Sequence, residues 1–214
     1  MNPRPSAQPG WQHVGLLGGT FDPPHLAHRA LAECALTHLQ LDRVLWLPAG
    51  QPWQKSYRHI TLAQHRCAMV RLLMQGEARF ELDEREIHRP GPSTTIQTVR
   101  ELCVEHPLTR WYLILGQDQY ARLDTWRQWE ELVRLVVLAV APREGEAVWP
   151  HPALRELARR DPSAHTLVEL PLRLHAVSST AVRAQCQSGA DITALVGPAV
   201  ARYIDEHRLY TGTP

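Results

Sequence analysis

The sequence lacks an excess of charge of either sign. Lys and Arg number 23, Asp and Glu number 22, and the formal net charge is +1. A chain without a global basic field is not drawn onto nucleic acid or onto an anionic membrane surface. We therefore expect no nucleic-acid or membrane partner, and we expect any acidic ligand to be held by local positive groups.

The sequence is also poor in cysteine and has no long apolar run. Its four cysteines form no C-x-x-C pair, and residues 1–10 hold three prolines and no apolar run, unlike a signal peptide. No stretch approaches the roughly 20 apolar residues of a membrane span. We expect a soluble protein in the reducing cytoplasm, with residues 1–12 as a disordered arm.

No internal repeat or low-complexity segment is visible, and 214 residues suit one domain, which we place at residues 13–210. Short apolar runs alternate with longer amphipathic segments, which is typical of a parallel α/β sheet. We predict an α/β fold, a Rossmann-like doubly wound, mainly parallel sheet with helices on both faces. The expected strands are 13–17, 44–47, 80–82, 111–115, 135–140, 166–170 and 172–177. The expected helices are 26–39, 62–74, 96–104, 126–132, 154–159 and two that begin at Thr180 and Pro198.

The segment Gly18-Gly19-Thr20-Phe21-Asp22-Pro23-Pro24-His25-Leu26-Ala27-His28 stands where the first expected strand passes into the first expected helix. In an open α/β sheet, ligands bind outside the carboxyl ends of strands, where helix amino termini offer free N–H groups. Gly18 and Gly19 lack side chains and tolerate positive φ, so the main chain can come close to a phosphate. We predict a phosphate site here.

His25 and His28 lie three residues apart, so on one helix both imidazoles face the same side. Imidazolium groups at that place could neutralise charge on a triphosphate. A pair of capping or core histidines is the alternative. A zinc site fits less well, because no cysteine or third histidine follows at ligand spacing.

These residues carry a family resemblance. Residues 18–28 resemble the G-G-T-F-D-P-x-H-x-G-H signature of the nicotinate mononucleotide adenylyltransferases, part of a wider nucleotidyltransferase superfamily, with Ala27 in place of a glycine. The resemblance spans about residues 13–210. It implies the fold predicted above, ATP contacts at Gly18, Gly19, Thr20 and Phe21, and catalytic roles for His25 and His28.

A second segment, Val177-Ser178-Ser179-Thr180-Ala181-Val182-Arg183, follows a late expected strand and opens a helix. A serine N-cap leaves N–H groups of the first turn for phosphate oxygens, and the planar guanidinium of Arg183 can bind two oxygens. A capped helix with a solvated arginine is the alternative. The segment resembles the superfamily signature I-S-S-T-x-x-R, which implies ATP contacts at Ser178, Ser179 and Thr180 and a catalytic Arg183.

A third set of residues follows the most apolar expected strand: Gly116-Gln117-Asp118, then Thr125-Trp126 and Trp129. A carboxylate there can accept hydrogen bonds from ribose hydroxyls, and an aromatic ring can stack on a pyridine. The alternative is that Asp118 caps a short helix and the tryptophans fill the core, which is a closer choice for Trp129 than for Trp126. Gly116, Asp118 and Trp126 resemble the family elements that hold the mononucleotide.

Two loops and the end of the chain extend the resemblance. Ser93-Thr94-Thr95 resembles the family segment P-S-Y-T, which implies contacts of Thr94 and Thr95 with the nicotinate end. Residues 51–55 stand in place of the family loop P-x-x-P-H-K, but Trp53 and Gln54 depart from it. Lys55 alone carries over as a mononucleotide contact, and a solvated loop lysine is its alternative. Residues 203–210 resemble the family finish Y-I-x-x-x-x-L-Y, which we interpret as structural packing.

The resemblance implies an enzyme of NAD biosynthesis that transfers AMP from ATP to nicotinic acid mononucleotide, giving nicotinic acid adenine dinucleotide and pyrophosphate. The mononucleotide phosphate would attack the α-phosphorus in line, without a covalent enzyme intermediate. Catalysis would then rest on positioning, worth roughly 7–11 kcal/mol, and on stabilising charge. Mg²⁺ is expected with ATP, held mainly by phosphate oxygens and water. No carboxylate cluster is visible, so no protein ligand to the metal is assigned.

Three other functions remain open at this point. The acceptor could be nicotinamide mononucleotide, or the chain could be a phosphopantetheine adenylyltransferase, which shares both phosphate signatures in a shorter chain. A non-catalytic nucleotide-binding module on the same fold would be expected to lose His25, His28 or Arg183, and all three are present. The sequence does not indicate an oligomeric state.

Overall fold

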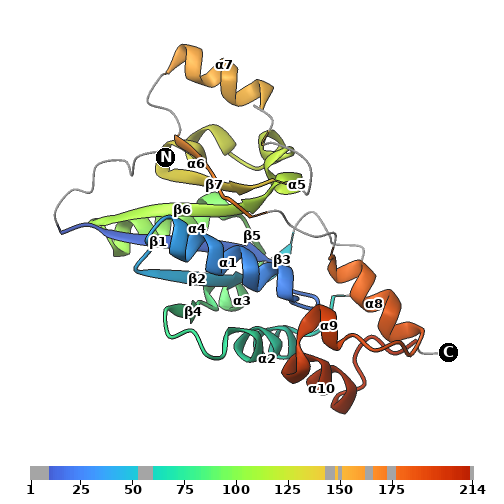
Figure 1. Cartoon of the computed structure of the whole chain (residues 1–214). Coiled ribbons are helices and arrows are strands. Elements are labelled where there is room, and N and C mark those ends of the chain that lie inside the picture. Colours follow the sequence, from blue (N-terminus) through green and yellow to red (C-terminus); the bar gives the residue numbers. More distant parts are fainter. Residues whose placement is uncertain are drawn as a thin grey trace.

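The chain folds around one six-stranded sheet in which every neighbouring pair of strands is parallel (Figure 1). The computed structural model describes residues 10–52, 60–142, 148, 151–161, 166–172 and 177–212. The strand order is β4-β2-β1-β6-β7-β8. It is the doubly wound order, in which the direction of winding reverses between β1 and β6. The strands are β1 (Gln12–Gly19), β2 (Arg43–Pro48), β4 (Phe80–Leu82), β6 (Thr109–Gly116), β7 (Val136–Ala141) and β8 (Thr166–Glu169).

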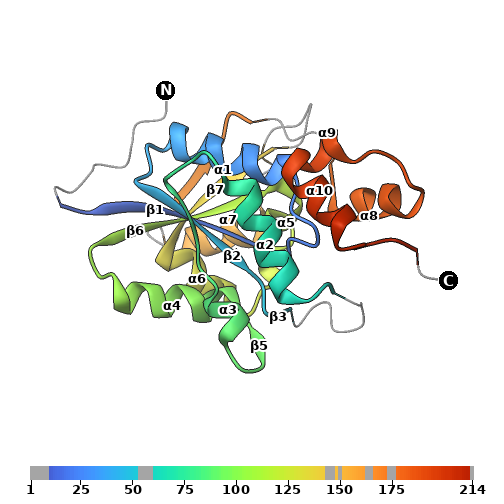
Figure 2. The same ribbon diagram turned by 90° about the horizontal axis from the view of Figure 1, so that it is seen from below.

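One face of the sheet is covered by helices from the two ends of the chain. On this face Leu17 of β1 packs in one buried core with apolar residues of α1 and α2 and of the last three helices. These helices are α1 (Leu26–His38), α2 (Ala63–Met74), α8 (Ser179–Gln187), α9 (Thr193–Val196) and α10 (Pro198–Glu206). Figure 2 shows α1 on the opposite side of the sheet from α4.

The other face carries a second core built from the middle of the chain. Leu16 of β1 packs there with Ile96, Leu132 and Leu154. Because successive side chains of a strand point to opposite faces, one apolar strand supplies both cores. The elements here are α4 (Thr95–Glu105), α5 (Gln117–Tyr120), η2 (Leu123–Thr125), α6 (Trp129–Leu135) and α7 (Pro152–Arg160). The short helix α3 (Arg85–His88) lies next to a parallel pair, β3 (Gln51–Pro52) and β5 (Pro92–Ser93).

The predicted fold class is confirmed, and the differences fall on short elements. The helix expected at 126–132 begins instead at Trp129 and ends at Leu135, because a 3-10 turn ends at Thr125 and Gln128 adopts a left-handed φ of 52°. Of the strand expected at 172–177, Leu172 and Val177 are not in a strand, and 173–176 lie outside the described residues. Residues 1–9 also lie outside them, so the N-terminal arm stays a prediction.

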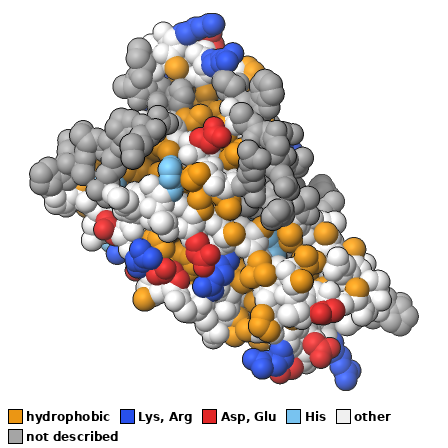
Figure 3. All heavy atoms as spheres, viewed as in Figure 1, with side chains coloured by type: hydrophobic (Ala, Val, Ile, Leu, Met, Phe, Trp, Pro, Cys, Tyr) orange, Lys and Arg blue, Asp and Glu red, His pale blue; other side chains and the backbone are white. Residues whose placement is uncertain are grey.

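The surface agrees with the balanced composition. On the face drawn in Figure 3, acidic and basic side chains are intermingled rather than gathered by sign. Within the described residues, no helix combines the length and apolar character needed to cross a membrane.

Candidate active site

A cleft of about 380 Å³ opens at the point where the sheet reverses its winding. β1 and β6 pair only as far as Leu16 and Leu113, whereas β1 continues beside β2 to Gly19. The carboxyl ends of the two central strands therefore separate, and side chains from both faces of the sheet reach the space between them. This crevice is where open α/β sheets bind ligands.

The cleft has two walls. We call the first the glycine wall, and its lining residues are Gly18, Gly19, Thr20, Phe21, His28 and Ser179. We call the second the tryptophan wall, and its lining residues are Glu86, Ser93, Thr94, Thr95, Thr98, Gln119, Arg122, Thr125, Trp126 and Arg127. The first wall belongs to the face of α1 and α8, and the second to the face of α4.

On the glycine wall, the two glycines leave the end of β1 uncovered. A Cβ atom added to Gly18 would meet no atom within 4 Å, so a ligand can approach the main chain there. A Cβ on Gly19 would lie 3.0 Å from the ring of Phe21. Both glycines are part of β1, and the left-handed residue of the segment is Phe21, with a φ of 51°. The expected close approach is supported, but positive φ at the glycines is not the reason for it.

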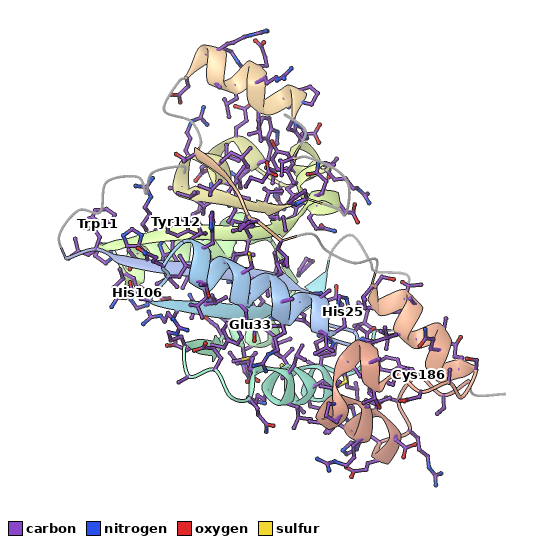
Figure 4. The ribbon with its side chains drawn as sticks, viewed as in Figure 1. Trp11, His25, Glu33, His106, Tyr112 and Cys186 are labelled. Carbon is purple, nitrogen blue, oxygen red and sulfur yellow. The ribbon has the colours of Figure 1, made fainter. Side chains whose placement is uncertain are left out.

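His25 and His28 stack at the start of α1, with ring centroids 3.7 Å apart. The backbone N–H of His25 donates to Nδ1 of His28 at 3.2 Å, which places the proton of a neutral His28 on Nε2. Burial lowers the pKa of His25 to about 4, and burial together with His25 lowers the pKa of His28 well below its usual value. The imidazolium pair expected from the sequence is therefore neutral in the ligand-free protein, where it offers N–H donors. His28 lines the cleft, whereas His25, the N-cap at the start of α1, is not among the lining residues (Figure 4).

The second signature docks directly on the first. The hydroxyl of Ser179 donates to the carbonyl of Pro23 at 2.9 Å, across 156 residues of sequence. Arg183 donates to the carbonyl of Asp22 at 2.6 Å and to the Thr180 hydroxyl at 3.2 Å. Ser178 caps α8 by accepting from the N–H of Ala181. Only Ser179 of this segment lines the cleft, and Ser178, Thr180 and Arg183 stand next to it.

Two residues that were not expected at the site from the sequence, Arg66 and Tyr210, hold the glycine wall from behind. Arg66 is only 2% exposed and donates to the carbonyl of Thr20 at 2.7 Å. The hydroxyl of Tyr210 donates to Oδ1 of Asp22 at 2.8 Å, and burial raises the pKa of this tyrosine. Arg66 could have been noticed in the sequence because it stands among the apolar residues of a predicted helix. Tyr210 packs against the first core, as expected for the end of the chain. Its hydrogen-bond partner, Asp22, belongs to the first phosphate signature.

On the tryptophan wall, Arg89 and three lining side chains form a hydrogen-bonded network. Arg89 donates to the hydroxyls of Ser93 and Thr98 at 2.8 and 3.1 Å. Thr98, buried at 1% exposure, donates to Oε1 of Glu86 at 2.7 Å. Burial raises the pKa of Glu86. These hydrogen bonds hold the segment that leads into α4 in place.

The contact residues predicted near the nicotinate end are placed unequally. Thr94 is the N-cap of α4, Thr95 its first residue, and both line the cleft. Trp126 is half-buried, packs on the second core and also lines the cleft, whereas Trp129 packs on that core alone.

The remaining predicted contacts lie elsewhere. Gly116 ends β6, and Asp118 is exposed in the first turn of α5, and neither is among the lining residues. Lys55, Trp53 and Gln54 lie outside the described residues.

Several lining residues were missed from the sequence. Gln119, Arg122 and Arg127 flank Thr125 and Trp126 along the chain, so the nearby aromatic motif was their only signal. Glu86 and Thr98 had none, because only the packed structure brings α3 against α4. Within the described residues, no three His, Cys, Asp or Glu side chains gather as metal ligands.

Comparison with known proteins gives concordant matches. A family model described as cytidylyltransferase-like matches residues 16–185. A protein of Methylibium petroleiphilum, named probable nicotinate-nucleotide adenylyltransferase, is 46% identical over 203 residues, covering 93% of this chain and 92% of its own. A protein of the same name from Synechococcus sp. (strain JA-3-3Ab) is 44% identical over 204 residues, covering 94% and 96%.

The fold has a close counterpart among solved structures. The Plasmodium falciparum nicotinic acid mononucleotide adenylyltransferase complexed with NaAD superposes with a TM-score of 0.77 at 19% identity, covering 93% of this chain and 97% of that one. At that identity the likeness shows a shared fold, while the two sequence relatives extend the similarity along nearly the whole chain.

Proposed function

This chain belongs to the nicotinate-nucleotide adenylyltransferases, and from that premise we propose how its cleft transfers AMP from ATP to nicotinic acid mononucleotide. One observation carries the proposal: both phosphate signatures meet on the glycine wall, opposite a half-buried tryptophan. The names of the relatives favour this enzyme over a nicotinamide mononucleotide or phosphopantetheine adenylyltransferase, and over a non-catalytic module.

We assign ATP to the glycine wall. The open main chain at Gly18 and Gly19 and the first-turn N–H groups near Ser179 suit phosphate oxygens. Neutral His28 supplies an Nε2–H donor, and Arg183 supplies the positive charge. Asp22, Thr20 and Pro23 are tied through their carbonyls to Arg183, Arg66 and Ser179, so these groups are fixed before ATP binds.

We assign the mononucleotide to the tryptophan wall, with its pyridine ring against Trp126 and its phosphate directed toward the glycine wall. An oxygen of that phosphate forms a bond to the α-phosphorus of ATP while the bond from the α-phosphorus to the bridging oxygen breaks, and pyrophosphate leaves. The attacking monoester is already anionic, so neither a protein nucleophile nor a general base is required. Preorganised donors at the leaving group supply the electrostatic part of catalysis.

Mg²⁺ enters this proposal as a companion of ATP. Phosphate oxygens and water would supply most of its ligands, as is usual for this ion. We further propose that the enzyme acts in the cytoplasm on these small molecules. Its four cysteines, Cys34, Cys67, Cys103 and Cys186, are free thiols, which suits a reducing compartment.

The test is pyrophosphate release by the purified protein with ATP and Mg²⁺, with nicotinic acid mononucleotide and nicotinamide mononucleotide offered in parallel. A strong preference for the acid is the expected result. Preference for the amide would overturn the substrate assignment, and silence with both would overturn the reaction.

A variant pair tests the role given to His28. His28→Ala should lower turnover by roughly 10²–10³, the effect of removing one preorganised donor. His38→Ala, at the exposed end of the same helix, should leave turnover unchanged. Equal turnover in the two variants would remove His28 from the catalytic assignment.

A further inference from the structure

The charges that line the cleft are few, and they are unevenly placed. Among the residues that the structure describes, those that line the cleft with charged side chains are Glu86, Arg122 and Arg127, all on the tryptophan wall. The histidine of the glycine wall, His28, is neutral in the ligand-free protein. Two arginines thus supply the positive charge of the lining itself, on the side assigned to the mononucleotide.

Neither arginine is used to hold the fold together. Both side chains are exposed, and within the described part of the chain no ion pair or side-chain hydrogen bond involves the guanidinium of Arg122 or of Arg127. By contrast, Arg85, Arg89 and Arg100 each pair with an acidic side chain nearby. Free guanidinium groups in a binding cleft are suited to the planar carboxylate or phosphate of a ligand.

Glu86 does not cancel this charge. Its Oε1 already accepts the hydroxyl of Thr98, and Thr98 accepts in turn from Arg89. Arg89 itself pairs with Glu101, so among the described lining residues the single carboxylate of Glu86 stands against the two guanidinium groups of Arg122 and Arg127. The cleft keeps a net attraction for anions on this wall.

Arg122 and Arg127 also stand on either side of Trp126 in the sequence, and the three side chains line the same wall. A pyridine ring stacked on Trp126 would hold its ring substituent near the edge of the indole, within the reach of long side chains. The acid and amide substrates differ only in that substituent. An ionised carboxylate there gains charge-assisted hydrogen bonds that a neutral amide does not.

We propose that Arg122 and Arg127 are the residues that make this enzyme prefer the acid mononucleotide over the amide, by binding the nicotinate carboxylate. The proposal rests on the function given above. The same arginines could instead bind a phosphate, which both mononucleotides carry. The two possibilities differ in one measurable quantity, the ratio of kcat/KM for the acid to kcat/KM for the amide.

The experiment measures both kcat/KM values, with saturating ATP and Mg²⁺, for the wild type, Arg122→Gln, Arg127→Gln and the double variant. We expect each single change to lower the acid-to-amide ratio by about tenfold, the scale of one charge-assisted hydrogen bond, with most of the loss in the acid value. Arg127→Lys should keep part of the preference, because it retains the charge but loses the fork of donors. Arg159→Gln, on the exposed face of α7, is the matched control and should keep the wild-type ratio.

Each other outcome is decisive. An equal loss for both mononucleotides would assign the arginines to a phosphate and overturn the proposal, as would an unchanged ratio in the double variant. Failure of the proposed function is distinguishable, because it would appear as a wild type that does not turn over the acid at all.

Discussion

At the scale of single residues, the histidines of the glycine wall show how burial sets charge. His25 is 6% exposed, stacks on His28, and has a pKa of about 4. In the function proposed above, neutral imidazoles would bind a triphosphate through N–H donors, and Arg183 would add positive charge beside this wall. A permanently charged pair would repel itself before the ligand arrived.

The depressed pKa of His25 predicts a loss of stability on acidification. Between about pH 6.5 and 4 the unfolded chain binds a proton at this histidine that the folded chain does not, so the free energy of unfolding falls as pH falls through that window. His25→Gln should reduce this slope by up to about 1.4 kcal/mol per pH unit. Urea unfolding at several pH values measures it, with His88→Gln, an exposed site, as the control. An unchanged slope in His25→Gln would contradict the prediction.

A second prediction concerns the hydroxyl of Tyr210. Tyr210→Phe removes the hydrogen bond to Asp22, so we expect a loss of about 1 kcal/mol in stability and a several-fold rise in KM for ATP. Tyr203→Phe is the matched control, because its hydroxyl bonds His65 on α2 rather than the glycine wall. It should cost similar stability without changing KM for ATP. If both variants changed KM alike, Tyr210 would have no special role.

At the scale of elements, two glycines lie in different surroundings: Gly50 is packed tightly against the backbone, and Gly18 faces open space. A Cβ on Gly50, which follows β2, would lie 2.0 Å from the carbonyl oxygen of Glu86, so the loop can pack against α3 only without a side chain. Gly18, one residue before the end of β1, lines the open cleft. Replacing glycine by alanine is therefore expected to disturb the fold at Gly50 and to disturb ligand binding at Gly18.

Gly50→Ala should destabilise the protein by several kcal/mol or prevent its accumulation, because a backbone clash must be relieved. Gly18→Ala should leave the unfolding free energy within about 0.5 kcal/mol of the wild type but weaken ATP binding. Thermal unfolding and ATP titration of both variants test the pair. Equal destabilisation would show that Gly18 serves the fold rather than the ligand.

Elements of the fold could be predicted from the sequence where a single run of residues carries the pattern. Residues 111–115 of β6 form an uninterrupted apolar run, and α1 repeats its apolar residues at helical spacing, so each element is predicted to within two residues of its ends. β3, β5, α3, α5 and α9 have two to four residues, too few for a period to show. Leu135 was expected to open a strand but closes α6, since the apolar run continues across the boundary.

The same distinction applies to the site. The glycine wall could be predicted because its residues follow one another in two short segments. The chain from Arg89 through Thr98 to Glu86 could not, because a surface loop, a short helix and α4 must first pack together. The charge state of the histidine pair depends on how deeply the two side chains are buried, and the spacing of residues in the sequence does not show burial.

At the scale of the whole molecule, the function proposed above places the two substrates on opposite walls of the cleft, where the sheet reverses between β1 and β6. The dinucleotide product should then occupy both walls at once. Because its halves are linked, binding of one half raises the effective concentration of the other. The product is thus expected to bind more tightly than either half.

Thermal unfolding tests this expectation. At equal concentrations, nicotinic acid adenine dinucleotide should raise Tm more than AMP or nicotinic acid mononucleotide, since a ligand at 100 times its Kd stabilises by about 2.7 kcal/mol. The three ligands are compared on the wild type and on a variant with Trp126→Ala, in which the advantage of the dinucleotide should shrink. A product that stabilises no better than AMP would mean that the walls do not act together.

The hydrogen bond between Tyr210 and Asp22 can form only late in the synthesis of the chain. The two residues are 188 positions apart, and at about 5–20 residues per second the ribosome needs roughly 10–40 s to pass from one to the other. Throughout that interval the nascent chain carries Asp22 without the tyrosine hydroxyl that donates to its carboxylate in the folded protein. The contacts of Arg66, Ser179 and Arg183 with the first phosphate signature can form earlier, so the Tyr210 contact is the last of the four to become available, and a product that stops short of residue 210 leaves the ribosome without it.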